Sequence, residues 1–287
     1  MKQQDERELK LTFQSKDKIQ CPVCETNFHR EELLSGGGRL IAGPLTDELH
    51  RKYEPSLKYG NVNPLVYQAT VCPSCWFAST EADFSALPAS VRDDIEMDRD
   101  ARIADVQNIF PSLDFSGPRA LAEGAASQYL VLRSYSFYPK EFSPTIKMGV
   151  AALRAGWLLD ELHQLFSGEH YDWLALLFKR KSRFLYKEGI LREQSGKEAL
   201  SGIKNFGPDT DKNYAYEGAL YLSALLEMKY GLRENPEARA ASLGDAKRTI
   251  AKIFGLGKSS KSKPGPLLEK ARDLYDSINR ELNETDE

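Results

Sequence analysis

The four cysteines are the residues whose type and spacing most clearly indicate chemistry. They form two Cys-x2-Cys pairs, Cys21/Cys24 and Cys72/Cys75, and no cysteine is left over. In a reducing compartment a repeated pair of this kind is typical of a tetrathiolate metal site, because each pair bends the backbone into a knuckle that aims two sulfurs at one ion. We therefore predict that these four side chains bind a single metal ion.

The expected ion is zinc, in a structural role. Four thiolates complete a tetrahedron around zinc and leave no open position for water or a substrate, which a catalytic site would require. Rubredoxin-like iron is a less favoured alternative, because tetrahedral sulfur ligands suit either metal. Two independent redox dithiols are a further alternative. They are less favoured because each pair has proline at its first intervening position and neither begins a convincing βαβ helix.

The sequence offers few other candidates for catalysis. His29 and His50 are expected to be loop residues, because four thiolates already satisfy the ion. A phosphate-loop interpretation of Gly255–Ser259 fails, since the position of its first glycine holds Lys252. The sequence contains no G-x-S-x-G, H-E-x-x-H or dinucleotide fingerprint. We therefore expect a protein without enzymatic activity, with a thiol redox enzyme as the alternative.

Two segments carry an excess of positive charge, although the whole chain has a formal net charge of −3. Residues 179–192 contain six Lys or Arg and one Glu, and residues 239–263 contain seven Lys or Arg and one Asp. The candidates for contacts with nucleic acid or an acidic partner are Lys179, Arg180, Lys181 and Arg183. Solvated helix faces are the favoured interpretation of both segments, because acidic stretches elsewhere balance the charge.

We expect a small β-rich zinc-binding module, residues 19–84, to position the cysteines. A charged N-terminal arm, residues 1–18, is expected to precede it. Residues 9–28 have the composition of a strand that leads into the first knuckle, and Leu65–Val71 that of a strand that leads into the second. The 47 residues between the pairs exceed the usual spacing of roughly 15–20. We therefore expect an insertion between the knuckles, with a return strand at residues 39–42.

The remainder of the chain, residues 85–287, is predicted to be helical. Apolar residues recur at helical spacing, for example Ile146, Val150 and Leu153. Helices are expected over residues 89–110, 119–138, 145–166, 170–191, 213–230, 238–254 and 266–282. The charged stretch over residues 81–105 is interpreted as a solvated helix face.

Helix pairs that follow one another indicate a solenoid of tetratricopeptide type, in which small residues let helices approach closely. Gly149, Gly156 and Gly218 are placed for such contacts. The consensus of this repeat is not legible, so a non-repetitive helical bundle is the alternative. The predicted fold class is therefore mainly α, with tetratricopeptide-like helical hairpins preceded by a small β-rich zinc-ribbon-like module.

Three stretches of the sequence resemble a known family. Cys21–Cys24 followed by Phe28, then Asn63–Tyr67 and Val71–Ala78, is similar to the bacterial domain-of-unknown-function family 2225. The similarity continues into the helical half, notably over residues 119–138, and covers most of the chain. The resemblance implies a zinc-ribbon-like N-terminus joined to tetratricopeptide-like helices, in a family with no established activity.

One position in each knuckle departs from the pattern of that family. Family members tend to have glycine directly after the second cysteine, and here these positions hold Glu25 and Trp76. Glycine there eases the approach of backbone amides to sulfur. Four cysteines at knuckle spacing outweigh this departure, and the metal prediction is kept.

The composition places the chain among globular proteins. It has 287 residues, of which 41% are hydrophobic and 28% are charged, values that exclude the disordered and collagen-like classes. The longest apolar stretch, Met148–Leu159, is interrupted by Arg154 and is shorter than the roughly 20 residues needed to span a bilayer, so no membrane partner is expected. Residues 1–18 lack the apolar region of a secretory signal, which predicts a cytoplasmic protein.

These observations favour a non-enzymatic zinc-binding interaction or scaffold protein, whose helical hairpins present a surface to an unidentified protein or peptide. The aromatic candidates to line that surface are Tyr135, Phe137, Tyr138, Tyr214 and Tyr216, although core packing is the favoured role for most of them. The alternative from a different class is a nucleic-acid-associated zinc-ribbon protein, which would use the two basic segments.

Overall fold

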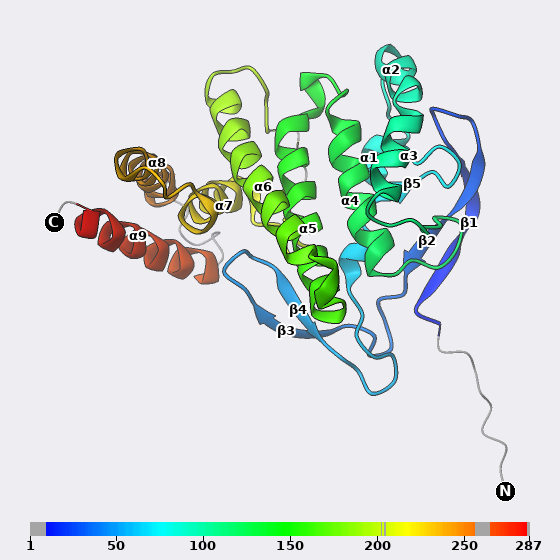
Figure 1. Cartoon of the computed structure of the whole chain (residues 1–287), viewed down its shortest axis with the longest axis horizontal. Coiled ribbons are helices and arrows are strands. Elements are labelled where there is room, and N and C mark those ends of the chain that lie inside the picture. Colours follow the sequence, from blue (N-terminus) through cyan, green and yellow to red (C-terminus); the bar gives the residue numbers. More distant parts are fainter. Residues whose placement is uncertain (1–9, 202, 204, 256–264, 286–287) are drawn as a thin grey trace, which may run out of the picture.

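The helices of the chain lie side by side in a row, which runs from the N-terminal strands at one end to α9 at the other (Figure 1). The computed structural model describes residues 10–201, 203, 205–255 and 265–285. The helices are α1 (Glu81–Phe84), α2 (Arg92–Met97), α3 (Arg99–Gln107), α4 (Leu121–Tyr135), α5 (Pro144–Leu165), α6 (Tyr171–Gln194), α7 (Ala215–Tyr230), α8 (Pro236–Gly255) and α9 (Gly265–Thr285). The predicted fold class, mainly α with a small β-rich N-terminal part, is confirmed. In the described ranges no helix is both long enough and apolar enough to cross a membrane.

The strands of the described residues form separate two-stranded antiparallel sheets. The pairs are β1 (Thr12–Gln20) with β2 (Asn27–Leu33), β3 (Ile41–Leu45) with β4 (Arg51–Glu54), and β5 (Thr70–Val71) with β6 (Ala78–Ser79). In the first and third pairs, the connection between the strands is a cysteine knuckle. The β3–β4 pair belongs to the expected insertion between the knuckles.

Two of the predicted strands are wrong in part. The strand expected over residues 9–28 is interrupted at the first knuckle, because the chain reverses there and returns as β2. The first part of the strand expected over Leu65–Val71 is instead a 3-10 helix, Pro64–Tyr67, and only its end, Thr70–Val71, is a strand. The side chain of Asn63 accepts a hydrogen bond from the Leu65 N–H (2.9 Å), and proline at the first position also favours a helical start.

Close packing of α5 against α6 forms the centre of the row. A Cβ atom at Gly156 of α5 would lie 2.9 Å from Cγ of Lys179 on α6, closer than packed carbon atoms come. Gly149, nearer the start of α5, faces Tyr186, nearer the end of α6, so the two helices are antiparallel. As the sequence predicts, these glycines let the two helices approach closely.

Two apolar cores lie within the molecule. One is built mainly from α5–α9, together with leucines of the N-terminal part. The other joins the cysteine knuckles to the first helices, since Cys72 and Phe77 pack there with Ile95 of α2 and Leu130 of α4. The knuckles therefore share their core with α1–α4. The boundary expected after residue 18 falls inside β1, and the boundary expected after residue 84 stays a prediction.

Candidate metal centre

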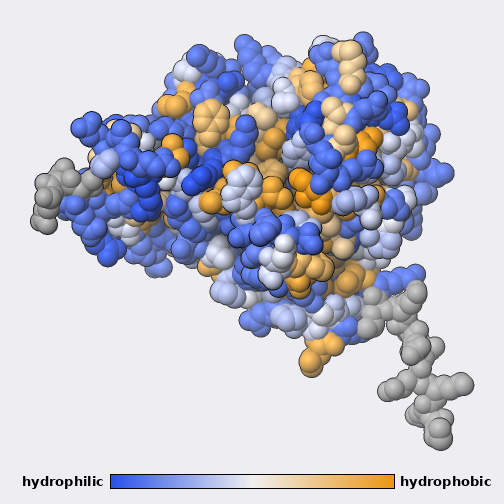
Figure 2. Space-filling model, in the orientation of Figure 1, coloured by the Kyte–Doolittle hydropathy of each residue, from blue (hydrophilic) through white to orange (hydrophobic). Residues whose placement is uncertain are grey.

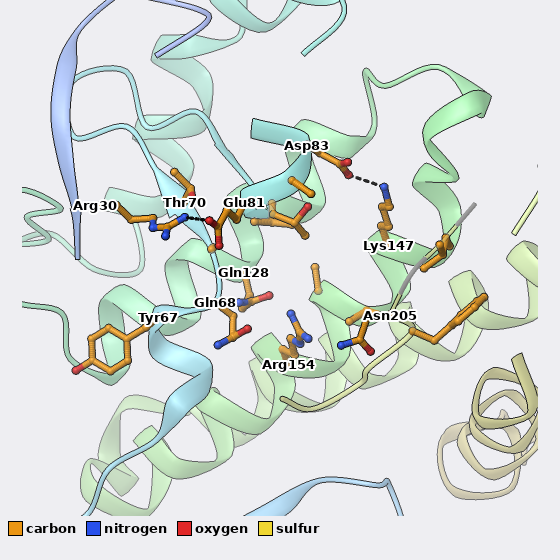
Figure 3. A pocket seen from close by; sticks show the side chains of 18 of the residues that line it. Arg30, Tyr67, Gln68, Thr70, Glu81, Asp83, Gln128, Lys147, Arg154 and Asn205 are labelled. Carbon is orange, nitrogen blue, oxygen red and sulfur yellow. Dashed lines mark hydrogen bonds and ion pairs between the residues drawn. The ribbon is translucent and has the colours of Figure 1, made fainter. Parts of the chain in front are cut away.

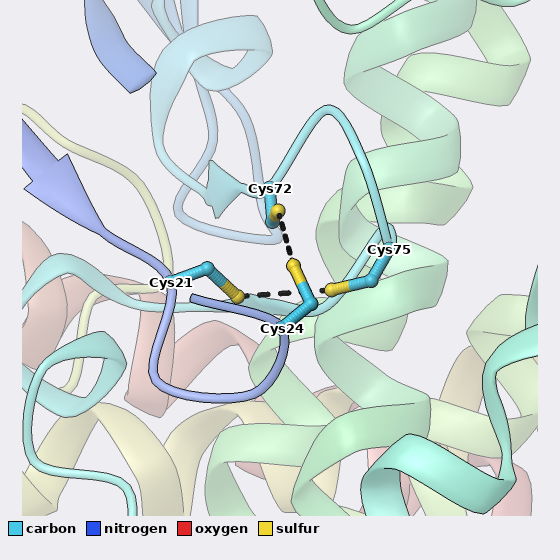
Figure 4. Close-up of side chains that lie close together, drawn as sticks. All are labelled: Cys21, Cys24, Cys72 and Cys75. Carbon is cyan, nitrogen blue, oxygen red and sulfur yellow. Dashed lines mark hydrogen bonds between the residues drawn. The ribbon is translucent and has the colours of Figure 1, made fainter. Parts of the chain in front are cut away.

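The four cysteine side chains converge on one point between the two knuckles (Figure 4). Their sulfur atoms all lie within 4.8 Å of one another. The shortest separations join one knuckle to the other, with 3.7 Å between Cys21 Sγ and Cys75 Sγ and 3.6 Å between Cys24 Sγ and Cys72 Sγ. Cys24 is partly buried, while the other three are buried. Segments 48 to 54 residues apart in the chain thus form one sulfur cluster.

The sulfur spacing fits a tetrahedral metal ion. A tetrahedron with metal–sulfur bonds of about 2.3 Å separates its sulfur atoms by about 3.8 Å. The two shortest separations, 3.6 and 3.7 Å, are close to this value, whereas a disulfide would bring two sulfurs to about 2 Å. All four cysteines are free. The side chains present can therefore hold a metal ion, and the spacing suits zinc and iron equally.

The two knuckles have the same backbone structure. In the first, the Cys21 N–H donates to the Thr26 carbonyl (2.9 Å) and the Glu25 N–H donates to the Cys21 carbonyl (3.0 Å). The second knuckle repeats both bonds at 2.9 Å, between Cys72 and the residues four and five positions later. This pattern closes a tight turn that presents both sulfurs of a pair on one side.

The residue after the second cysteine of each knuckle lies in the left-handed region, with φ of 63° at Glu25 and 56° at Trp76. This conformation explains why glycine suits the position, because any other residue there costs about 1–2 kcal/mol. Contacts outside the turn hold both side chains. Trp76 is buried edge-on against Phe115, with ring centroids 5.2 Å apart, and Glu25 forms an ion pair with Arg92 (2.7 Å).

Hydrogen bonds among the thiols shift their acidities in opposite directions. The thiols of Cys21 and Cys75 lower the pKa of Cys72 to about 4, assisted by the backbone N–H groups of Cys75 and Ser74. Contacts with the thiols of Cys72 and Cys75, followed by burial, raise the pKa of Cys21. Four thiolates so close together require a cation, and binding that cation releases the remaining thiol protons. Acid pH therefore opposes metal binding.

Arginines of α2 and α3 hold the outer sides of the knuckles. Arg102 is 1% exposed, and its Nε donates to the Cys75 carbonyl (2.8 Å). Arg99 donates to the Ser74 carbonyl and Arg92 to the Val23 carbonyl, each at 3.2 Å. The sequence analysis missed these residues, because the charged stretch over residues 81–105 was interpreted as a solvated face. Arg99 and Arg102 are three residues apart and share one face of α3, whereas Arg92 begins α2, and the i, i+3 spacing of the first two is the signal in the sequence.

The basic residues named as candidate contacts lie on α6, which contributes no residue to the sulfur cluster. Lys179 forms an ion pair with a carboxylate of α5, and Arg183 donates two hydrogen bonds to Glu227 of α7 (3.0 and 2.9 Å). Arg180 and Lys181 are exposed. Two of the four charges are thus used between helices, and contact with nucleic acid or an acidic partner stays a prediction.

The second basic segment is described only in part, since residues 256–263 lie outside the described residues. Arg239 is buried and donates to Glu281 (2.7 Å) and to the Glu227 carbonyl (2.8 Å). Arg248 pairs with a neighbouring carboxylate on its own helix. Within the described part of the segment, these two arginines therefore serve packing and local ion pairing.

The two histidines considered as additional ligands lie apart from the sulfur cluster. His29 is exposed, with its Nδ1 2.7 Å from the Ser15 carbonyl oxygen. His50 is buried, stacks on Trp157 with ring centroids 4.2 Å apart, and lies 2.5 Å from Asp209 through Nδ1 and Oδ2. Neither side chain belongs to the group of ligand atoms that the cysteines form.

The aromatic residues expected to line an interaction surface are mostly core residues. Tyr135, Tyr138 and Tyr214 are buried, while Phe137 and Tyr216 are half-buried. Tyr135 and Tyr138 pack in the core that includes the knuckles, with ring centroids 5.0 Å apart. Core packing, the role favoured for most of these residues, is confirmed for Tyr135, Tyr138 and Tyr214.

Comparisons with known proteins agree with this architecture without adding an activity. Residues 14–278 match a family described as an uncharacterised protein conserved in bacteria (DUF2225). A protein of Borreliella burgdorferi, which bears the name "Uncharacterized protein", is 41% identical over 274 residues, or 95% of this chain and 98% of that one. No solved structure matches the chain. The family match includes both knuckles and α1–α8.

Proposed function

The chain belongs to the DUF2225 family of uncharacterised bacterial proteins, and from this premise we propose that it is a non-enzymatic interaction protein. In this proposal a structural zinc ion joins the two knuckles of a module over residues 19–84. The helices of residues 85–287 form the scaffold that binds a protein partner. We assign zinc rather than iron because four thiolates without an open position are a common form of structural zinc site.

The observation that carries the proposal is an apolar stripe on the outer face of α6. Trp173, Leu177, Phe184 and Leu191 follow one another at spacings of four, seven and seven residues, so they share one face of the helix. All four are exposed, with 62% of Trp173 and 55% of Phe184 accessible to solvent. Figure 2 shows apolar side chains among polar ones on the face of the molecule that α6 crosses.

The opposite face of α6 makes the contacts that fold the protein. The buried residues of α6 are Ala175, Ser182, Leu185, Tyr186, Gly189 and Ile190. The outer stripe is therefore not needed to pack α6 against α5. An apolar stripe along a helix of 24 residues is typical of a surface that another helix covers.

The charges beside the stripe favour a particular kind of partner. Arg180 and Lys181 are exposed, and at 100° per residue they lie on opposite sides of the line through Leu177 and Phe184. A complementary partner is an amphipathic helix with an apolar ridge and acidic residues along its edges.

A pull-down from cells that naturally produce the protein tests this proposal, with the full-length chain as bait. The double variant Leu177→Gln/Phe184→Gln is expected to lose a reproducible protein partner by at least about tenfold, because two apolar anchors are removed. Glutamine favours helix, so α6 should remain folded. The matched control, Leu57→Gln/Met97→Gln, removes two exposed apolar side chains elsewhere and should retain the partner.

Equal capture by the double variant and the wild-type chain would contradict the proposed role of α6. Recovery of nucleic acid instead of protein, with a yield that falls steeply as salt is raised, would favour the nucleic-acid alternative.

A further inference from the structure

A second potential binding site lies in a cavity away from the four cysteines. Its volume is about 720 Å³, a size typical of small-molecule sites. Residues of β2, α1, α4 and α5 and the segment Tyr67–Thr70 line the cavity (Figure 3). The apolar part of the wall includes Val131, Ile146, Val150 and Ala151. Neither the sulfur cluster nor the outer stripe of α6 contributes to it.

Most charged side chains around the cavity are already paired. Arg30 forms ion pairs with Glu32 (2.7 Å) and Glu81 (2.5 Å), and Lys147 pairs with Asp83 (2.5 Å). Figure 3 shows two of these pairs at the rim, where the dashed lines join Arg30 to Glu81 and Lys147 to Asp83. These groups form the walls of the cavity and leave little charge for a ligand.

Arg154 is the exception among the lining charges. Its Nε donates to the Pro208 carbonyl (2.7 Å), and no carboxylate of the described residues lies within ion-pair distance of its guanidinium. In Figure 3 the terminal nitrogens of Arg154 point into the cavity, towards Gln68 and Gln128. Burial lowers the pKa of Arg154, and the more distant charge of Asp209 only partly offsets this effect. An unpaired guanidinium in such a place is ready to accept an anion.

Gln128 provides a second, independent indication of a ligand. Its side chain is 1% exposed and faces the same cavity, and its Nε2 donor has no hydrogen-bond partner among the residues that the structure describes. Buried amide groups are nearly always hydrogen-bonded, so a lone donor beside an empty volume indicates an acceptor supplied from outside the chain.

We propose that this cavity binds a small monocarboxylate with an apolar body. The guanidinium of Arg154 forms an ion pair with the carboxylate, and Gln128 donates a hydrogen bond to one of its oxygens or to an adjacent acceptor. The hydrocarbon part of the ligand packs against the apolar wall. A phosphate ester fits less well. The lining carries four acidic residues against three basic ones, and a dianion would be repelled by the carboxylates that the single free guanidinium does not neutralise.

Binding of hexanoate and phenylacetate to the full-length chain, followed by saturation-transfer NMR and titration calorimetry, tests the proposal. Hexanamide and hexyl phosphate serve as probes with the same hydrocarbon chain and a different head group. We expect both acids to bind and both comparison compounds to bind at least about tenfold more weakly, because a charge-assisted hydrogen bond contributes on that scale.

Two variants assign the contacts. Arg154→Gln should weaken hexanoate binding about tenfold to a hundredfold. Gln128→Leu should weaken it about tenfold while the melting temperature stays the same or rises, because the lone buried donor is removed. Gln107→Leu, at an exposed position outside the cavity, is the matched control and should leave affinity unchanged. The Gln128 variant decides the test if the Arg154 variant does not fold.

The proposal is overturned if neither acid binds at 10 mM, roughly the weak limit for a site of this kind. It is also overturned if hexanamide or hexyl phosphate binds as tightly as hexanoate, or if Gln128→Leu leaves hexanoate affinity unchanged.

Discussion

Replacement of Cys72 by serine is expected to abolish metal binding and to unfold both knuckles. A serine hydroxyl is not a thiolate, so the ion loses one of four ligands, and structural zinc sites contribute roughly 10–16 kcal/mol of binding free energy that is also folding free energy. Elemental analysis should fall from about one zinc per chain to a small fraction of that value. The exposed neighbour Ser74→Ala keeps all four sulfurs and is expected to keep the zinc.

The extent of unfolding in Cys72→Ser can be mapped by limited proteolysis. Because the knuckles share a core with Phe84, Ile95 and Val106, we expect cleavage throughout α1–α3 and a resistant fragment that begins near α4. A fragment that begins near residue 85 would instead support the domain boundary predicted from the sequence. Full zinc occupancy in Cys72→Ser would contradict the tetrathiolate site itself.

Replacement of Arg102 by methionine is expected to cause the second-largest loss of folding stability. Its guanidinium is 1% exposed and donates to the Cys75 and Ile95 carbonyls, with Asp98 at 3.9 Å. Removal leaves two buried carbonyls without their donor, while Asp98 keeps its hydrogen bonds from Arg133. The free energy of unfolding should therefore fall by about 3–5 kcal/mol. Thermal unfolding of the zinc-loaded chain should then occur about 10 °C lower.

Arg99→Met is the matched control for Arg102→Met. Arg99 lies on the same helix and donates to a carbonyl of the same knuckle, but its side chain is 38% exposed. Water can replace its bond, so the expected loss is below about 1 kcal/mol. Equal losses in the two variants would show that burial of Arg102 does not decide its role.

The sequence predicted the long helices well because their apolar residues recur at helical spacing over many turns. The single helix expected over residues 89–110 was wrong in part, because it is divided at Asp98 into α2 and α3. The last helix was expected over residues 266–282, and α9 spans Gly265–Thr285. Short elements were predicted poorly. The segment Leu65–Val71 has the composition of a strand, but the cap that Asn63 provides to the Leu65 N–H starts a 3-10 helix there.

The spacing of the cysteines was enough to predict that they converge, because a Cys-x2-Cys pair fixes the local turn by itself. The residues that support the site could not be predicted in the same way. Arg102 reaches Cys75 only through the packing of α3 on the knuckle, and Arg154 and Gln128 meet across a cavity between two helices. Such contacts depend on tertiary packing rather than on local sequence.

The outer face of α6 shows a different limit of sequence patterns. The stripe through Trp173 and Phe184 places large apolar side chains on the exposed face, so hydropathy identifies the helix but not its orientation. The buried face carries small residues and also large ones, of which Leu185 and Tyr186 pack against Gly149 of α5. Large apolar residues therefore lie on both faces of this helix, and the glycines of α5 mark the side on which it packs.

X-ray absorption spectroscopy of the chain, purified under reducing conditions without chelators, tests most directly whether the four thiolates hold one ion. We expect a zinc edge and a first shell of four sulfur atoms at about 2.3 Å. An iron edge with the same four-sulfur shell would show that the ion is iron rather than zinc, and the tetrathiolate site would stand. Nitrogen or oxygen ligands at about 2.0 Å, or a metal-free protein with disulfides Cys21/Cys24 and Cys72/Cys75, would contradict a structural tetrathiolate site.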